Sequence, residues 1–153
     1  MQRKSISMIA APIIMVCGLL FAGSSARAND EDTKCTNRTL RGDYGFVAQG
    51  VLIGIPGFPP EAQFRSVGVA HFDGKGNLTW QEHTVENGRP LNADWVQASG
   101  TYTVNSNCTG TAVVNTPNSP FPLTLVLVAV KEGKQIETIL DSNAITSVFI
   151  KVE

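Results

Sequence analysis

The sequence predicts an all-β domain, built as an eight-stranded antiparallel up-and-down β-barrel. Eight segments of strand character follow one another, turn residues separate nearly all of them, and no convincing helix occurs after an apolar N-terminal segment. The connections are short, which favours antiparallel neighbours. Eight such strands either close into a barrel, which removes exposed sheet edges, or split into a sandwich, and we expect the barrel.

Residues 1–28 have the features of a secretory signal peptide. Arg3 and Lys4 precede an apolar run from Ile6 to Phe21, and the small-residue sequence Ala26-Arg27-Ala28 follows this run. The run is about 16 residues long, whereas a helix needs roughly 20 to span a bilayer. We therefore expect a cleaved signal peptide and an exported protein, periplasmic or secreted.

The charge balance of the remaining chain excludes one class of partner. The segment expected to be removed carries three of the 12 basic residues and none of the 13 acidic ones. The mature chain therefore has a net charge of about −4 and no basic run, which argues against nucleic-acid binding. Its length, about 125 residues, suits a single domain with a substantial core.

Two cysteines remain after processing, Cys35 near the new N-terminus and Cys108 in the middle of the chain. Export places them in an oxidising compartment, so we expect a disulfide between them. The bond would close a loop of about 74 residues, and loop-closure entropy then gives roughly 4 kcal/mol of stabilisation. Residues 29–41 are otherwise polar, and we expect a loosely held leader that is fixed only by Cys35.

The barrel domain is predicted to occupy residues 42–153. Residues 43–52 alternate in polarity with a period of two, as in a strand with one face on a core, whereas the proline-rich segment 54–61 is a loop. The clearest unit is a hairpin from Phe64 to Val85 around Asp73-Gly74-Lys75-Gly76. The further strands are predicted at 99–104, 108–115, 121–130, 135–140 and 144–152. Segment 121–130 is apolar on both faces, which predicts burial on both sides.

The turn chemistry of the hairpin fixes its expected register. A loop with an odd number of residues places the even-numbered positions of both arms on one face, and an even loop mixes the faces. The odd loop gives a coherent apolar face, made of Phe64, Gly68, Ala70, Phe72, Leu78 and Trp80. In this register His83 lies opposite residue 67, about 13 Å along the strand from His71. The two histidines therefore cannot share a metal ion, and no zinc-type spacing occurs.

An outer-membrane barrel is an alternative for an exported, eight-stranded chain. Several strands offer only about six or seven residues, whereas a membrane-spanning strand needs about 9 to 11. Outward positions also carry polar residues such as Arg65 and Gln81. We therefore expect a soluble domain with no stable membrane insertion after signal cleavage.

Candidate ligand-binding residues follow from the inward face. Glu82 shares that face with Trp80 and Phe72, so its carboxylate either faces an apolar cavity, where it could act as an acid, or lies at an open rim in water. Tyr44 and Tyr102 have the same parity and either offer hydroxyls to a ligand or are core tyrosines. The predicted ligand-binding set is Tyr44, Phe46, Phe72, Trp80, Glu82 and Tyr102. No motif predicts a cofactor or a metal site, and Glu82 is the one weak catalytic candidate.

Three motifs stand out along the mature chain. They are Leu40-x-Gly42-x-Tyr44-Gly45-Phe46, Val67-Gly68-Val69-Ala70-x-Phe72-Asp73-Gly74-Lys75-Gly76-Asn77 and Ser99-Gly100-Thr101-Tyr102-Thr103-Val104-Asn105-x-x-Cys108-Thr109-Gly110-Thr111. In these motifs the chain resembles a group of small exported bacterial proteins without assigned function. More loosely, it is similar to calycin-like eight-stranded barrels of the allene oxide cyclase and dirigent type. That likeness implies a cavity for apolar molecules, but the catalytic residues of that family have no matching positions here.

Three functions are consistent with the sequence. The first is non-catalytic binding of a small apolar ligand or a partner by an exported barrel. The second is a cofactor-free isomerase or cyclase that uses Glu82 as an inward acid. The third is a structural or envelope-interaction protein with a filled core. A cavity inside the barrel would separate the third function from the first two.

Overall fold

Nine strands and two short 3-10 helices make up the part of the chain that the structure, a computed structural model, describes: residues 34–56 and 59–153. The barrel strands are β1 (Gly42–Ile53), β2 (Glu61–Phe72), β3 (Asn77–Glu86), β5 (Val96–Val104), β6 (Thr109–Asn115), β7 (Leu123–Val130), β8 (Gln135–Leu140) and β9 (Ala144–Lys151). The remaining elements are η1 (Asn37–Leu40), β4 (Arg89–Pro90) and η2 (Lys131–Gly133). The predicted signal peptide, residues 1–28, lies outside the described residues.

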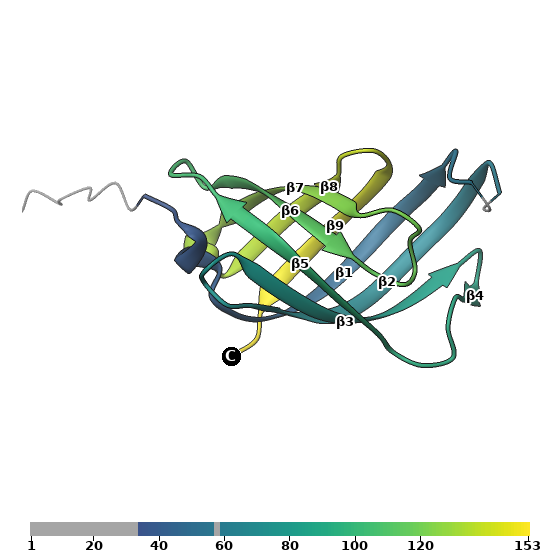
Figure 1. Ribbon diagram of the computed structural model, residues 1–153, viewed down its shortest axis with the longest axis horizontal. Helices are drawn as coiled ribbons and strands as arrows, with labels where there is room; N and C mark the ends of the chain where they lie inside the picture. The colour runs from purple at the N-terminus through teal and green to yellow at the C-terminus, as the bar shows by residue number, and fades with distance from the viewer. Residues whose placement is uncertain (1–33, 57–58) are drawn as a thin grey trace, which may run out of the picture. The chain divides into compact units, whose positions relative to one another are not determined.

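The strands close into an antiparallel barrel (Figure 1). Their order around the barrel is β2-β1-β9-β8-β7-β6-β5-β3, and pairing of β2 with β3 completes the ring. β1 and β9, the first and last strands, pair from Tyr44 opposite Lys151 to Val51 opposite Ala144. Apart from this closure, each barrel strand pairs with its neighbours along the chain. The up-and-down barrel, rather than the sandwich, is therefore confirmed.

The hairpin of β2 and β3 has the predicted register. Phe72 lies opposite Leu78, and Val67 lies opposite His83. Asp73 stabilises the turn, because one oxygen of its carboxylate accepts hydrogen bonds from the backbone N–H groups of Lys75, Gly76 and Asn77. The Asn77 side-chain amide donates to the other carboxylate oxygen, and this hydrogen bond, together with those from the backbone, holds the pKa of Asp73 well below its usual value. The even-numbered side chains consequently face the barrel interior, as the odd-loop register requires.

Aromatic side chains fill much of the barrel interior. The ring of Phe72 packs edge-to-face on Tyr44 and Tyr102, with centroids 5.3 and 5.0 Å apart. Phe46 packs on Phe149, with a centroid distance of 4.9 Å. Such pairs add to the stabilisation that comes from removing apolar area from water.

The prediction that residues 121–130 are buried on both sides is wrong. Leu125, Leu127 and Ala129 face the core, but the outward side chains of Val126 and Val128 are 38% and 42% exposed. The physical reason is that the described residues supply no helix or second sheet to cover this outer wall. Outward valines suit a strand through their branched shape as well as through burial, so an apolar run does not by itself indicate two buried faces.

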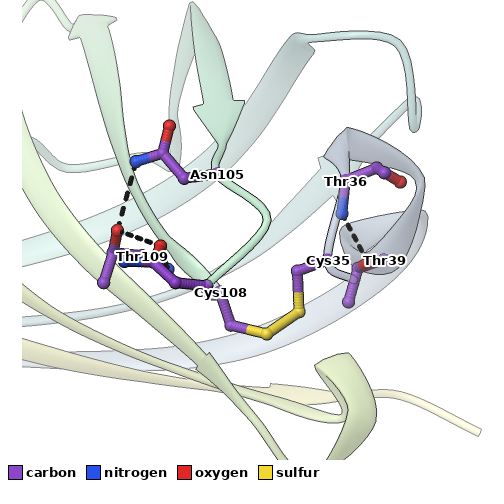
Figure 2. Close-up of a disulfide and its surroundings, with 7 residues drawn as sticks. Cys35, Thr36, Thr39, Asn105, Cys108 and Thr109 are labelled. Carbon is purple, nitrogen blue, oxygen red and sulfur yellow. Dashed lines mark hydrogen bonds between the residues drawn. A yellow bond between two sulfur atoms is a disulfide. The ribbon is translucent and has the colours of Figure 1, made fainter. Parts of the chain in front are cut away.

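One end of the barrel is covered by η1, and we call it the plugged end (Figure 1, dark blue). Leu40 is fully buried there, and the Asn37 side chain accepts a hydrogen bond of 2.7 Å from the backbone N–H of Val104. The predicted disulfide between Cys35 and Cys108 is present and ties the chain before η1 to the β5–β6 turn (Figure 2). Residues 34–41 are thus held by more contacts than the expected loose leader, which the polar composition did not indicate.

Candidate functional site

A cavity of about 130 Å³ lies at the end of the barrel opposite η1, which we call the open end. Inward side chains of the strands form its walls, and the β6–β7 connection, residues 116–122, contributes to its rim. The large apolar groups of the walls include Phe46, Leu52, Phe64, Trp80, Leu125 and Phe149. A cavity of about 150 Å³ in an apolar core can hold benzene, so this one suits a group of similar size.

The structure divides the predicted ligand-binding residues between the two ends of the barrel. Phe46, Trp80 and Glu82 line the cavity. Tyr44, Phe72 and Tyr102 are buried toward the plugged end and do not line it. Three of the six predicted residues are therefore brought together at one site.

Both tyrosine hydroxyls are engaged by the backbone at the plugged end. The Tyr44 hydroxyl donates to the carbonyl of Gly133, and the Tyr102 hydroxyl donates to the carbonyl of Asn37 over 2.9 Å. Burial, together with the neighbouring Tyr102, raises the pKa of Tyr44 to about 12. Burial is also the main cause of a raised pKa at Tyr102. These hydroxyls act as core groups that fasten the plug and the β7–β8 turn.

Glu82 is buried in the cavity wall rather than placed at a rim in water, with 4% of its surface exposed. β3 positions it two residues after Trp80 on the inward face. Its Oε1 atom accepts hydrogen bonds from the Thr116 hydroxyl at 2.7 Å and from the Asn118 amide at 3.3 Å. Its Oε2 atom accepts from the Ser66 hydroxyl at 3.3 Å. Neutral donors thus orient the carboxylate from three sides.

A directed series of hydrogen bonds continues behind the carboxylate. The Asn118 amide donates to Thr84 at 3.5 Å, and the Thr84 hydroxyl donates to Ser66 at 3.0 Å. Because Ser66 accepts from Thr84, its own proton is free to point at Glu82 or at the nearby carbonyl of His83. The amide of Asn92 in turn donates to the side-chain oxygen of Asn118. The series holds Glu82 in one orientation.

The partners of Glu82 were not predicted from the sequence. Ser66 and Thr84 face each other across β2 and β3, and their even numbers give them the inward parity of Glu82. Ser66 and Thr84 are polar residues on a mostly apolar face, and this pattern was the signal in the sequence that could have indicated the network. Thr116 and Asn118 lie in a connection, where no periodicity indicates which way a side chain points.

Trp80 gives the cavity wall an unusual polar group. Its indole N–H is buried and has no hydrogen-bond partner among the described residues. The ring packs against Phe46, with centroids 5.5 Å apart. Buried indole N–H groups usually find a partner, so this donor is an exception within the wall.

The histidines lie on the outside of the barrel, as the register predicted. His71 contacts Asp43 through a 2.6 Å hydrogen bond, and both side chains are exposed. The ring centroids of His83 and Trp95 are 6.0 Å apart. Residues 34–56 and 59–153 contain no group of three His, Cys, Asp or Glu side chains that could hold a metal ion. Within the same residues, no helix has the length and apolar character needed to cross a membrane.

No protein-family model, no curated protein and no solved structure matches the chain. The resemblance drawn from the sequence motifs is therefore supported for the eight-stranded barrel alone.

Proposed function

We propose that this chain is an exported barrel protein that binds a small, largely apolar molecule in the cavity at its open end without carrying out chemistry on it. The observation that carries the proposal is a mostly apolar cavity with one fixed carboxylate in its wall. Ligand sites are commonly apolar hollows with a few polar groups that set orientation, and the mouths of barrels are one place where they occur. The disulfide and the signal-like N-terminal sequence support export.

A cofactor-free isomerase or cyclase is the second candidate function. The burial of Glu82 in the wall of the apolar cavity favours it, because a carboxylate shielded from bulk water can exchange a proton with a substrate bound beside it. Glu82→Gln separates the two functions, since it should abolish turnover and leave binding of an apolar molecule nearly intact. Unchanged turnover in this variant would exclude Glu82 as the acid.

Binding can be measured at the cavity itself with toluene as the probe. The chain has two tryptophans, so its amide spectrum contains two indole N–H signals. Trp80 lines the cavity, whereas Trp95 is 52% exposed and lies outside it. We expect toluene to shift the Trp80 signal in a saturable manner and to leave the Trp95 signal in place. Equal shifts of both signals, or no shift up to the solubility of toluene, would contradict the proposal.

A pair of substitutions on β1 tests whether the cavity is the binding site. Ala48 faces the cavity, and Val47 next to it faces outward. Ala48→Leu fills part of the cavity, so we expect at least tenfold weaker toluene binding. Val47→Leu places the same leucine side chain outside the barrel and should leave the affinity unchanged. Circular dichroism establishes that both variants are folded, and Ser147→Val is a second filling variant from β9, because Ser147 also lines the cavity.

A further inference from the structure

We propose that the ligand of this cavity carries a protonated amine, whose ammonium group contacts Glu82 while its apolar body fills the remaining space. This inference rests on the proposed ligand-binding function and names the chemical class of the ligand. It follows from three features of the cavity: an uncompensated carboxylate, a free acceptor position on that carboxylate, and aromatic walls beside it.

The first feature is the charge of Glu82. Among residues 34–56 and 59–153, the one close pair of a basic and an acidic side chain is His71 with Asp43, on the outside of the barrel. Among the same residues, no lysine or arginine lines the cavity. Buried carboxylates are usually paired with a cation, because neutral donors satisfy their oxygens without compensating their charge. A cation supplied by the ligand would compensate it.

The second feature is the hydrogen-bonding capacity that Glu82 retains. A carboxylate offers about four acceptor positions, two on each oxygen. Thr116 and Asn118 donate to Oε1, whereas Ser66 alone donates to Oε2 and shares its proton with the carbonyl of His83. One position on Oε2 therefore has no donor among the described side chains. An ammonium group has three donors and can form a charge-assisted hydrogen bond there.

The third feature is the aromatic surface next to the carboxylate. Trp80 lies two residues before Glu82 on the same inward face, Phe46 packs on Trp80, and Phe149 packs on Phe46. The faces of aromatic rings attract cations, and tryptophan does so most strongly. Aromatic walls beside a carboxylate suit an ammonium group better than a neutral hydroxyl, because a hydroxyl gains only the hydrogen bond.

The size of the cavity limits the apolar body of the ligand. A volume of about 130 Å³ accommodates a single six-membered ring or a short branched chain. The cavity continues to a rim where Phe121 is 59% exposed, so a longer apolar group can extend toward solvent. The ligand class is therefore a small amphiphilic amine.

Three probes of nearly equal size test this inference: benzylamine, benzyl alcohol and toluene. They carry an ammonium, a hydroxyl and no polar group, respectively, at neutral pH. Their affinities are measured by titration of the Trp80 indole signal and by calorimetry. We expect benzylamine to bind about tenfold more tightly than benzyl alcohol, because hydrogen bonds to charged groups exceed neutral ones by roughly 1.4 kcal/mol.

Two charge-removing variants locate the source of that preference. Glu82→Gln keeps the shape of the side chain and should abolish the advantage of benzylamine, while toluene binding changes by less than about twofold. Glu137→Gln removes one acidic charge from the outer wall, where Glu137 is exposed, and should preserve the advantage. If Glu82→Gln does not fold, the unmodified protein is used instead. A nuclear Overhauser contact between the methylene of bound benzylamine and the Glu82 side chain would then show that the amine binds beside Glu82.

The outcomes distinguish this inference from the proposed function. Equal binding of all three probes, tighter binding of benzyl alcohol, or a bound benzylamine without contact to Glu82 would overturn the amine assignment and leave the apolar site standing. Failure of all three probes to bind would overturn the proposed function as well. An advantage of benzylamine that is lost equally in Glu82→Gln and Glu137→Gln would reflect general charge attraction and would also overturn the assignment.

Discussion

Gly68 illustrates how the absence of one side chain shapes the barrel interior. It faces inward on β2, opposite Glu82 on β3. A Cβ atom built on Gly68 would lie 2.5 Å from the ring of Phe46 and 2.3 Å from the carbonyl oxygen of Gln81. The Phe46 ring therefore occupies the space that a side chain at position 68 would need. Because Phe46 also lines the cavity, this contact links the packing of the wall to the shape of the site.

Replacing Gly68 by alanine should destabilise the barrel. The new methyl group must displace either an aromatic ring or a neighbouring backbone, and overpacking of this kind costs about 1–3 kcal/mol of unfolding free energy. Gly45→Ala on β1 is the matched control, since no atom lies within 4 Å of a Cβ built there. Urea unfolding should show a loss for Gly68→Ala and little change for Gly45→Ala. Equal stabilities of the two variants would disprove the proposed clash.

The raised pKa of Tyr44 predicts a dependence of stability on alkaline pH. Tyr44 has a pKa of about 12 in the native barrel and about 10 when unfolded. The contribution of Tyr44 to the free energy of unfolding is therefore complete below pH 10. It is lost as pH rises from about 10 to 12, because the hydroxyl releases its proton at a lower pH in the unfolded chain than in the barrel. Tyr44→Phe should lose less unfolding free energy than the parent protein between pH 9 and pH 11. Parallel losses in both proteins would show that Tyr44 does not contribute.

The candidate site was predictable from the sequence only as far as side-chain alternation reaches. Alternation along β3 correctly turned Trp80 and Glu82 inward, because a strand fixes the direction of every second side chain. It did not tell the two ends of the barrel apart, so Tyr44 and Tyr102 were grouped with the cavity residues Phe46, Trp80 and Glu82. Thr116 and Asn118 reach Glu82 from a connection, where direction depends on the tertiary fold.

At the level of elements, the short helix η1 contributes to the core of the barrel. It is four residues long, yet its last residue, Leu40, is fully buried against the core. The backbone of η1 also accepts the hydroxyl of Tyr102. Leu40, the one nonpolar residue of η1, thus covers the end of the barrel that the strands do not close.

Leu40→Ala should lower the free energy of unfolding by about 2–5 kcal/mol, the range for deleting a buried leucine side chain. Arg38→Ala in the same helix is the control, because Arg38 is exposed and should change stability by less than about 0.5 kcal/mol. Chemical unfolding followed by circular dichroism measures both. A small effect of Leu40→Ala would mean that η1 is dispensable for the barrel.

Elements with a strong local signal were predicted well, and those that depend on the surrounding structure were not. The β2–β3 hairpin was correct in register because Asp73 and the glycines that follow it specify the turn. β7 was assigned two buried faces because its composition is apolar, although burial depends on what packs outside it. η1 was missed because one leucine among polar residues is a weak pattern.

For the whole molecule, the barrel separates a stabilised end from the end that holds the proposed binding cavity. Cys108 precedes β6, and Thr116 follows it, so the disulfide and the Glu82 network are about 26 Å apart along this strand. The plugged end holds the disulfide, η1 and both tyrosine hydroxyls. The open end holds the cavity, with Glu82 and Trp80 in its wall. The disulfide and η1 therefore lie away from the proposed binding cavity.

This separation predicts that loss of the disulfide weakens the fold but not the site. The bond joins residues 73 positions apart, and the corresponding loop-closure estimate is about 4 kcal/mol of unfolding free energy. Cys35→Ser with Cys108→Ser should therefore unfold at a lower urea concentration. Under native conditions the affinity for toluene, measured at Trp80, should stay within about twofold, because the cavity walls contain neither cysteine. A parallel loss of affinity in a variant that remains folded would show instead that the two ends of the barrel are coupled through its strands.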